Sequence, residues 1–446
     1  MRLLLIISTL LQALYLILLP ISFEGDAGGY LRYAQFLAGN GGEFQYFRPP
    51  GFPMYLHLVG TTWAESFYGV IAANALMGIA MPLLVYGILK PVGRLALVAA
   101  AIFALSTIPF SYAKVLITEH PYSFFLLLGT FGLSRFVYTQ KAMWAWLCMG
   151  ALFIALMMRN EALWVAIVAV VGMLVVAGKK RNVVLVSCLA VALLTVGWVE
   201  KRSAWVDARG LHNFSGRQMY WRINYSFGRQ FVDQVNGPRS EQLEKIFPGL
   251  IAMRDESANW TLGTEAVKVL GVEPANALFK DVVKESVRAH PEIIWRIIRS
   301  GFGYLGYSIE EQRLIWARDV YEKMPFNIGN AAKYSMSPRL YAQYTRSQSR
   351  KSKGWDRVHA IGQHMHNLAR LLVGTILLST FWGLFFTRHR SLAVFVFLTV
   401  GCLISAAMAG FGFNVRYEHS ILPFLMILMV LGIDGLQNRL KPTKPA

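Results

Sequence analysis

Long apolar segments alternate along the chain with short polar stretches, and their length is the first structural signal. A helix of about 20 apolar residues crosses the roughly 30 Å of hydrocarbon in a membrane. Segments close to that length lie at 3–22, 67–89, 95–111, 120–138, 142–158, 162–178, 182–199, 370–387, 391–411 and 419–437. The pattern predicts an all-α polytopic membrane protein, a bundle of about ten transmembrane helices.

Lysine and arginine in the loops between these segments indicate the orientation, because positively charged loops stay on the cytoplasmic side. Every second loop and both chain ends carry them, with Asp434 as the acid nearby: Arg2, Lys90, Arg94, Arg135, Lys141, Lys179, Lys180, Arg181, Arg388, Arg390, Arg439, Lys441 and Lys444. We therefore expect a cytoplasmic N-terminus, with the first loop and the long segment 200–369 outside.

This orientation predicts three parts. A transmembrane core at 1–199 carries the first outer loop, 23–66; a mainly helical outer segment follows at 200–369, and the last spans lie at 370–446. We expect the first apolar segment to be a membrane span, because its apolar core of about 20 residues is longer than that of a signal peptide. The three cysteines, Cys148, Cys188 and Cys402, fall inside predicted spans, so we expect packed thiols.

The composition agrees with a membrane protein. Of 446 residues, 15% are charged, against about 25% in soluble domains, and the mean hydropathy is +0.42. The net charge is +19, and the outer segment contains more lysine and arginine than aspartate and glutamate. A basic outer face attracts anionic lipid headgroups or phosphorylated lipid substrates, so we expect membrane lipids as partners; a solvated basic surface is the alternative.

The first outer loop is longer than a turn requires. A stripe of apolar residues three and four apart predicts a short amphipathic helix, suited to lying on the membrane: Tyr30, Tyr33, Ala34, Leu37 and Ala38. The sequence Gly39-Asn40-Gly41-Gly42 ends it. Asp26 stands at its start, where it could act as a helix N-cap or in chemistry.

Arg48 lies on a stiff part of the same loop. It precedes Pro49 and Pro50, and the residue before a proline is restricted to extended conformations. The apolar stretch "GFPMYLHLVG" follows and again has interfacial character. Two membrane-lying helices joined by a rigid basic corner indicate a site rather than a simple connection.

Four short stretches, all on the predicted outer side, carry charged residues near span ends. They are "D-A-G-G-Y-x2-Y-A-x-x-L" with "R-P-P-G-F-P-x-Y-L" in the first loop, "ITEHPYSFFLLLG" (117–129), "ALMMRNEALW" (155–164) and "NVRYEHSILPFLMIL" (414–428). Together they resemble motifs of the GT-C glycosyltransferases, in the bacterial branch related to protein O-mannosyltransferases and lipid A aminoarabinose transferases. The resemblance covers about 1–180 and 390–437 and implies a GT-C-type bundle.

The family transfers a sugar from a polyprenyl-phosphate donor to an acceptor outside the membrane. Such transfer needs a carboxylate that activates the acceptor hydroxyl and cations that stabilise the leaving phosphate. The resemblance therefore implies catalytic roles for Asp26 and Glu119. It implies donor phosphate binding by Arg48, Arg416 and Arg159, because guanidinium matches phosphate bidentately.

Further candidates lie beside these residues. We expect Tyr30, His120, Tyr417 and Glu161 to contact substrate, and Asp26, Glu119 and His120 to form a divalent-metal set if they converge. The family does not decide whether a metal is used. Structural alternatives stay open: an ion pair for Glu119, interfacial arginines that reach toward headgroups, and an Arg159–Glu161 pair.

Other functions are less consistent with the sequence. It contains no glycine-rich phosphate loop of the P-loop or Rossmann type, which argues against a nucleotide-sugar donor, and we expect no nucleic-acid partner. A polysaccharide or lipid transporter or flippase is the main alternative, but it predicts ionisable residues at mid-membrane and internal repeats. A membrane-anchored scaffold is a third. We expect a bacterial inner-membrane enzyme whose site faces the periplasm and whose acceptor is a glycan, lipid or protein.

Overall fold

The computed structural model describes most of the chain. The described residues are 1–21, 26–42, 44–206, 215–221, 223, 235–248, 256–297, 336–349, 355–409 and 415–440. Within them the backbone alone is described at 221, 256–260, 348–349, 355–360, 363, 366, 370, 406–409 and 415–418.

Each predicted apolar segment overlaps a long helix. These helices are α1 (Arg2–Leu18), α4 (Tyr68–Leu89), α5 (Arg94–Leu105), α7 (Glu119–Thr139), α8 (Ala142–Met158), α9 (Ala162–Val176), α10 (Arg181–Ser203), α20 (Trp355–Thr380), α21 (Arg390–Ala409) and α22 (Val415–Leu440). Segment 95–111 is divided between α5 and the short α6 (Ile108–Ser111), and 370–387 extends past α20 into a 3-10 turn. Short 3-10 turns stand between some of them: η1 (Lys90–Val92), η2 (Gly178–Lys180) and η6 (Phe381–Phe385). The all-α prediction is confirmed, since the described residues form no β-strand.

Four of the described helical segments are long and apolar enough to cross a membrane: 68–92, 178–203, 367–385 and 419–440. Five shorter apolar helices accompany them, among them α1, α5 and α8. The exposed side chains on these helices are largely leucine, isoleucine and valine, as on α10 at Leu189, Leu193 and Leu194. Such a surface suits lipid, and the number of crossings stays a prediction.

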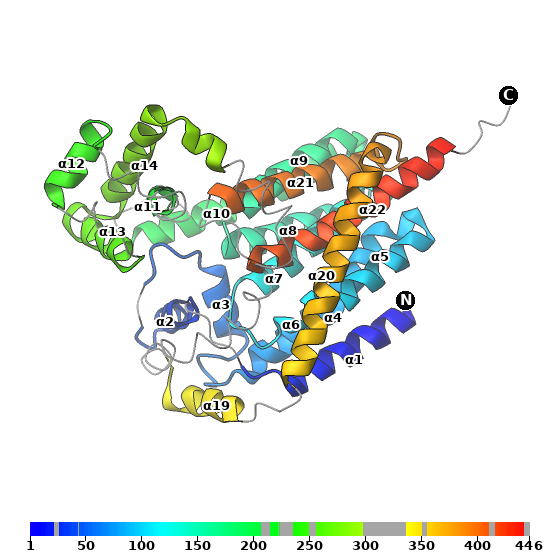
Figure 1. The fold of residues 1–446 in the computed structure, drawn as a ribbon, viewed down its shortest axis with the longest axis horizontal. Coiled ribbons are helices and arrows are strands. Elements are labelled where there is room, and N and C mark those ends of the chain that lie inside the picture. Colours follow the sequence, from blue (N-terminus) through cyan, green and yellow to red (C-terminus); the bar gives the residue numbers. More distant parts are fainter. Residues whose placement is uncertain are drawn as a thin grey trace.

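Most of the long helices run side by side, α20 crosses them at a steep angle, and the bundle has two distinct ends (Figure 1). At one end lie the start of α1 and the end of α22. There Tyr138 Oη, at the end of α7, lies 2.7 Å from His389 Nδ1, just before α21, and Gln140 Nε2 donates to Val176 O of α9. The loops predicted to be cytoplasmic therefore gather at one end.

The opposite end carries the short helices. The first loop forms α2 (Ala27–Leu37) and α3 (Gly51–Leu58), and α6 (Ile108–Ser111) precedes α7. The predicted amphipathic helix is thus present, but most of its stripe packs into the protein: Tyr30, Tyr33 and Ala34 are buried, while Leu37 and Ala38 are partly exposed. Packing against α3 places both loop helices over the bundle end (Figure 1).

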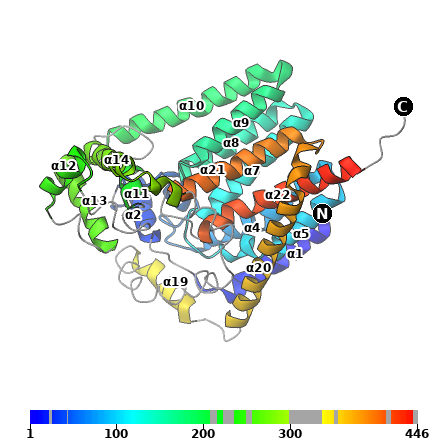
Figure 2. The same cartoon turned by 45° about the horizontal axis from the view of Figure 1, so that its top comes forward.

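A second hydrophobic core lies outside the bundle. Helices α11 (Ser215–Trp221), α12 (Pro238–Ile246), α13 (Glu256–Leu270) and α14 (Val272–Ala289) surround it, and they form a unit at one side of Figure 2. Its buried members include Leu243, Leu262 and Phe279. The outer segment therefore contains helical structure with a core of its own, while the domain boundaries stay predictions.

Helix α19 (Pro338–Ser349) ties the outer segment back to the first loop. Gln343 accepts a hydrogen bond from the Phe67 backbone N–H and donates to Glu65 O, and Ser347 Oγ accepts from the Ile21 N–H. These bonds fix the end of α1 and the start of α4 against one short helix. The loop that carries the candidate residues is thus held from both sides.

Candidate functional site

Asp26 and Arg48 form an ion pair across the first loop. Arg48 Nη2 donates to Asp26 Oδ1 at 2.9 Å; the Asp26 side chain is 40% exposed and that of Arg48 is 11% exposed. Asp26 occupies the N-cap position of α2, yet its side chain makes no capping hydrogen bond. The carboxylate therefore forms an ion pair with Arg48 and does not cap the N-terminus of α2.

The absence of a side chain at Gly29 leaves room for the Arg48 guanidinium. A Cβ at Gly29 would lie 2.8 Å from Arg48 Nε, so a larger residue would displace the side chain. Arg48 also lies over the Tyr30 ring at 4.3 Å and the Phe47 ring at 5.0 Å, a cation–π arrangement. Burial alone would lower the pKa of Arg48, but Asp26 and Tyr30 raise it above its ordinary value, so the group stays charged.

A second ion pair joins two neighbouring helix ends. Arg159, which follows α8, donates to Glu119 Oε1 at 2.7 Å and to Glu161 Oε1 at 3.1 Å. The Glu119 side chain, at the start of α7, is 3% exposed, while that of Glu161 is 26% exposed. Tyr122, one turn along α7, places its ring 5.5 Å from the same guanidinium. One arginine thus holds a buried and a half-buried carboxylate.

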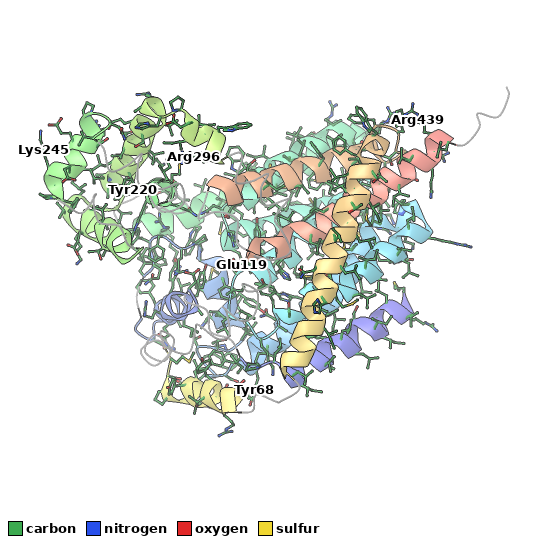
Figure 3. The ribbon with its side chains drawn as sticks, viewed as in Figure 1. Tyr68, Glu119, Tyr220, Lys245, Arg296 and Arg439 are labelled. Atoms are coloured by element: carbon green, nitrogen blue, oxygen red, sulfur yellow. The ribbon has the colours of Figure 1, made fainter. Side chains whose placement is uncertain are left out.

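Tyr30 contacts Arg48 of the first pair and is influenced by the charges of both pairs. Burial raises its pKa; the Arg48 charge opposes that shift, the Asp26 and Glu119 charges add to it, and Arg159 opposes it. Charges act on one phenol in this way only when they lie near it. The first loop and the ends of α7 and α8 therefore contribute to one site. Figure 3 shows Glu119 there, where the bundle meets the short helices, far from Arg439 at the other end of α22.

Close backbone packing joins the first loop to α8. A Cβ at Gly51, the first residue of α3, would lie 2.5 Å from the Met157 carbonyl carbon. Met157 is two residues from Arg159, and Gly51 is three residues from Arg48. The missing side chain at position 51 thus allows the two arginines to share one region.

His120 does not join the carboxylates. Its Nε2 lies 2.8 Å from the Asn74 carbonyl oxygen, and its Nδ1 lies 3.0 Å from His419 Nε2. Both ring nitrogens are therefore engaged, and the side chain is fully buried. Within the described part of the chain no three histidine, cysteine, aspartate or glutamate residues could hold a metal ion. The metal set predicted from Asp26, Glu119 and His120 depended on their convergence, and His120 instead contacts Asn74 and His419.

Two predicted residues lie partly outside the described structure. Arg416 and Tyr417 belong to the first turn of α22, but their side chains are not among the described ones. The polar residues that sequence reasoning missed are His419, Asn74 and Tyr55, all buried. Polar residues inside apolar segments were the signal that could have indicated them.

The described geometry combines carboxylates, which can act in acid–base chemistry, with guanidinium groups, which can bind phosphate. Asp26 is a partly exposed carboxylate beside a fixed guanidinium, and Glu119 is a buried one beside another. A carboxylate can accept a proton from a hydroxyl, and fixed guanidinium groups can stabilise negative charge that develops on a phosphate. The arrangement suits group transfer with an anionic leaving group.

Comparisons with known proteins give distant structural likenesses. No family model and no curated protein matches the sequence. Among solved structures, ArnT from Cupriavidus metallidurans bound to undecaprenyl phosphate is 13% identical, with 98% of this chain and 77% of that chain covered and a TM-score of 0.36. The oligosaccharyltransferase AglB from Archaeoglobus fulgidus, in complex with an inhibitory peptide and a dolichol-phosphate, is 10% identical, with 99% and 52% covered and a TM-score of 0.37. At these scores the likenesses carry no argument about the chain.

Proposed function

We propose that this protein is an integral membrane glycosyltransferase of the GT-C type. It transfers a hexose or a pentose from a polyprenyl-phosphate donor to a cell-envelope acceptor, which is a glycan, a lipid or a protein. The reaction takes place on the periplasmic face of the bacterial inner membrane. Support comes from the four sequence motifs that resemble this family and from the geometry around Tyr30.

The observation that carries the proposal is the pairing of two carboxylates with two arginines, one pair in the first loop and one at the adjoining ends of α7 and α8. Asp26 with Arg48 and Glu119 with Arg159 both act on the Tyr30 phenol. Each pair sets a candidate base beside a fixed cation. Sugar transfer from a lipid phosphate needs both groups, because a hydroxyl loses a proton while a phosphate leaves with negative charge.

The two carboxylates take different roles. Asp26 is the base, since its side chain is 40% exposed and an acceptor hydroxyl can reach it. Glu119, only 3% exposed, orients Arg159. As Asp26 takes up the acceptor proton it loses its charge, so Arg48 becomes available to the leaving phosphate. Arg159 and Arg416 complete the phosphate site.

The remaining candidates bind the substrates around these groups. Tyr30 presents a neutral phenol, because burial raises its pKa, and it is suited to a hydrogen bond with a sugar hydroxyl. Glu161, which is 26% exposed, faces the accessible part of the site, and Tyr417 belongs to the first turn of α22. The basic outer segment contributes a general attraction to anionic lipid.

Replacement of Asp26 by asparagine tests the proposal. Asparagine keeps an oxygen that can accept the hydrogen bond from Arg48, but it cannot act as a base. We expect the rate of sugar transfer by Asp26→Asn to fall about 10²- to 10⁴-fold, with a melting temperature lowered only by the loss of the Asp26–Arg48 ion pair, so that the variant stays folded. Mass spectrometry of envelope glycans and lipids from cells with and without the gene identifies the product, and transfer is then measured in proteoliposomes. A stable variant with full activity would contradict the assignment.

A further inference from the structure

A chain of buried hydrogen bonds connects the first loop to the last helix of the bundle. Tyr55 Oη, on α3, donates to Asn74 Oδ1 of α4 at 2.7 Å. The Asn74 carbonyl oxygen faces His120 Nε2 of α7, whose Nδ1 faces His419 Nε2 of α22. All four side chains are buried, and the two imidazoles are fully so. Two consecutive helices, α3 and α4, are thereby joined to α7 and to the distant α22.

The donor and acceptor roles of these partners determine which imidazole nitrogens carry a proton. A carbonyl oxygen only accepts, so His120 carries its proton on Nε2 and donates it to Asn74 O. Nδ1 of the neutral ring is then an acceptor, and His419 Nε2 donates to it. A side chain at 419 that places its donor elsewhere leaves the buried His120 Nδ1 without this bond, which is costly in a low-dielectric interior.

The imidazole contact lies beside a turn of α22 that carries site residues. α22 begins at Val415, so His419 follows Arg416 by three residues and lies within one helical turn of it along the backbone. The Ser123 and Ser420 hydroxyls, 2.7 Å apart, add a second link between α7 and α22. The Tyr112 ring packs on His419 with centroids 4.4 Å apart. These contacts fix α22 to α7 next to Arg416.

We propose that His419, bonded to His120, is the positioning residue for the first turn of α22 and therefore for Arg416. Glu119 directly precedes His120, so the bond between the imidazoles sets the place of Arg416 relative to the Glu119–Arg159 pair. This inference rests on the proposed function, in which Arg416 binds the donor phosphate. It assigns His120 to the support of the site rather than to contact with substrate.

Amide substitutions at the two positions give a sharp test. The glutamine amide nitrogen reaches the place of imidazole Nε2, whereas the shorter asparagine amide reaches that of Nδ1. At position 419 we therefore expect His419→Gln to keep the bond and His419→Asn to lose it. At position 120 the order reverses, because the Asn oxygen takes the place of Nδ1: His120→Asn keeps the bond to His419, and His120→Gln loses it.

Binding of undecaprenyl phosphate to the purified full chain in detergent is the readout, with undecaprenol as the lipid that lacks a phosphate. We expect the bond-breaking variant of each pair to raise the Kd for undecaprenyl phosphate about five- to tenfold, with undecaprenol binding unchanged. The expected pattern is that the Gln variant binds undecaprenyl phosphate more tightly than the Asn variant at position 419, whereas the Asn variant binds it more tightly than the Gln variant at position 120. A general loss of stability does not produce this pattern. Equal affinities of the Gln and Asn variants, or the same variant binding more tightly at both positions, overturn the proposal.

A double-mutant cycle with Arg416→Ala separates this inference from the proposed function. If His419 acts through Arg416, the double variant that combines His419→Asn with Arg416→Ala binds undecaprenyl phosphate about as weakly as Arg416→Ala alone. If the increases in Kd of the two single variants multiply in the double variant, the positioning role is overturned and the phosphate role of Arg416 stays intact. Wild-type affinity of Arg416→Ala refutes that phosphate role, and the inference with it.

Discussion

Arg159 is the residue whose removal would leave the most unbalanced charge in the described site. It holds Glu119, whose side chain is 3% exposed, and Glu161, which is 26% exposed. An arginine spans two carboxylates because its donors are spread over a planar fork, whereas a lysine offers one compact ammonium. The pair therefore depends on the shape of the guanidinium as well as on its charge.

We expect Arg159→Ala to lower the free energy of unfolding by about 3–5 kcal/mol, because it leaves the buried Glu119 charge without its ion pair. Arg159→Lys restores the charge but not the bridge, so its melting temperature should lie between those of Arg159→Ala and wild type. Thermal unfolding of the detergent-purified protein measures both. Lys245→Ala is the control: it breaks an exposed ion pair with Glu241, and such pairs contribute about 0–1 kcal/mol. Equal melting temperatures for Arg159→Ala and Lys245→Ala would contradict the expectation.

At the scale of elements, the site depends on how closely α3 approaches α8. Gly51 lies against the Met157 backbone, where a Cβ would come within 2.5 Å of the carbonyl carbon. Backbone atoms cannot move aside as a flexible side chain can. The first-loop arginine and the arginine after α8 therefore keep their spacing only with glycine at this position.

Gly51→Ala should push α3 away from α8 and separate Arg48 from the Glu119–Arg159 pair. We expect sugar transfer to fall at least tenfold, because small displacements of positioning groups cost catalysis strongly. Gly150→Ala in α8 is the matched control, since a Cβ there meets nothing within 4 Å, and alanine favours the helix. Transfer rates and melting curves of both variants are the measurements; a Gly51→Ala enzyme as active as Gly150→Ala would show that the approach is unimportant.

At the scale of the whole molecule, the carboxylate–arginine pairs and the basic loops occupy opposite ends of the bundle. α7 starts with Glu119 at the site and ends near Tyr138, which contacts His389. Since the basic loops are expected in the cytoplasm, the site should face outward. The second hydrophobic core lies toward the same end of the bundle as the first loop (Figure 2), so we expect it on the outer side as well.

Reporter fusions test this orientation. A fusion at position 45, in the first loop, and one at position 280, in α14, should give the signal of the outer compartment. A fusion at position 180, between α9 and α10, should give the cytoplasmic signal. Alkaline phosphatase and a fluorescent protein that matures in the cytoplasm provide the two readouts. A cytoplasmic signal at 280 would place the site on the wrong side for a periplasmic reaction.

The sequence could predict the helices better than the contacts between them. A membrane span depends on composition over about 20 residues, so every predicted apolar segment overlaps a helix. Asp26 and Arg48 were predicted as separate site residues, but their pairing depends on the fold of the loop around Gly29. The contact between His120 and His419 could not be predicted, because the two residues are 299 positions apart in the sequence. Such contacts follow from the rotation and packing of helices, which apolar patterns do not specify.

The separation of the two histidines has a consequence for the biogenesis of the protein. At about 5–20 residues per second, a ribosome needs roughly 15–60 s to extend the chain from His120 to His419. During that interval α7 enters the membrane with an imidazole whose partner does not yet exist. Insertion of α22 then supplies the missing donor and closes the bundle. Chains released before α22 is made should therefore be preferred substrates of membrane quality-control proteases.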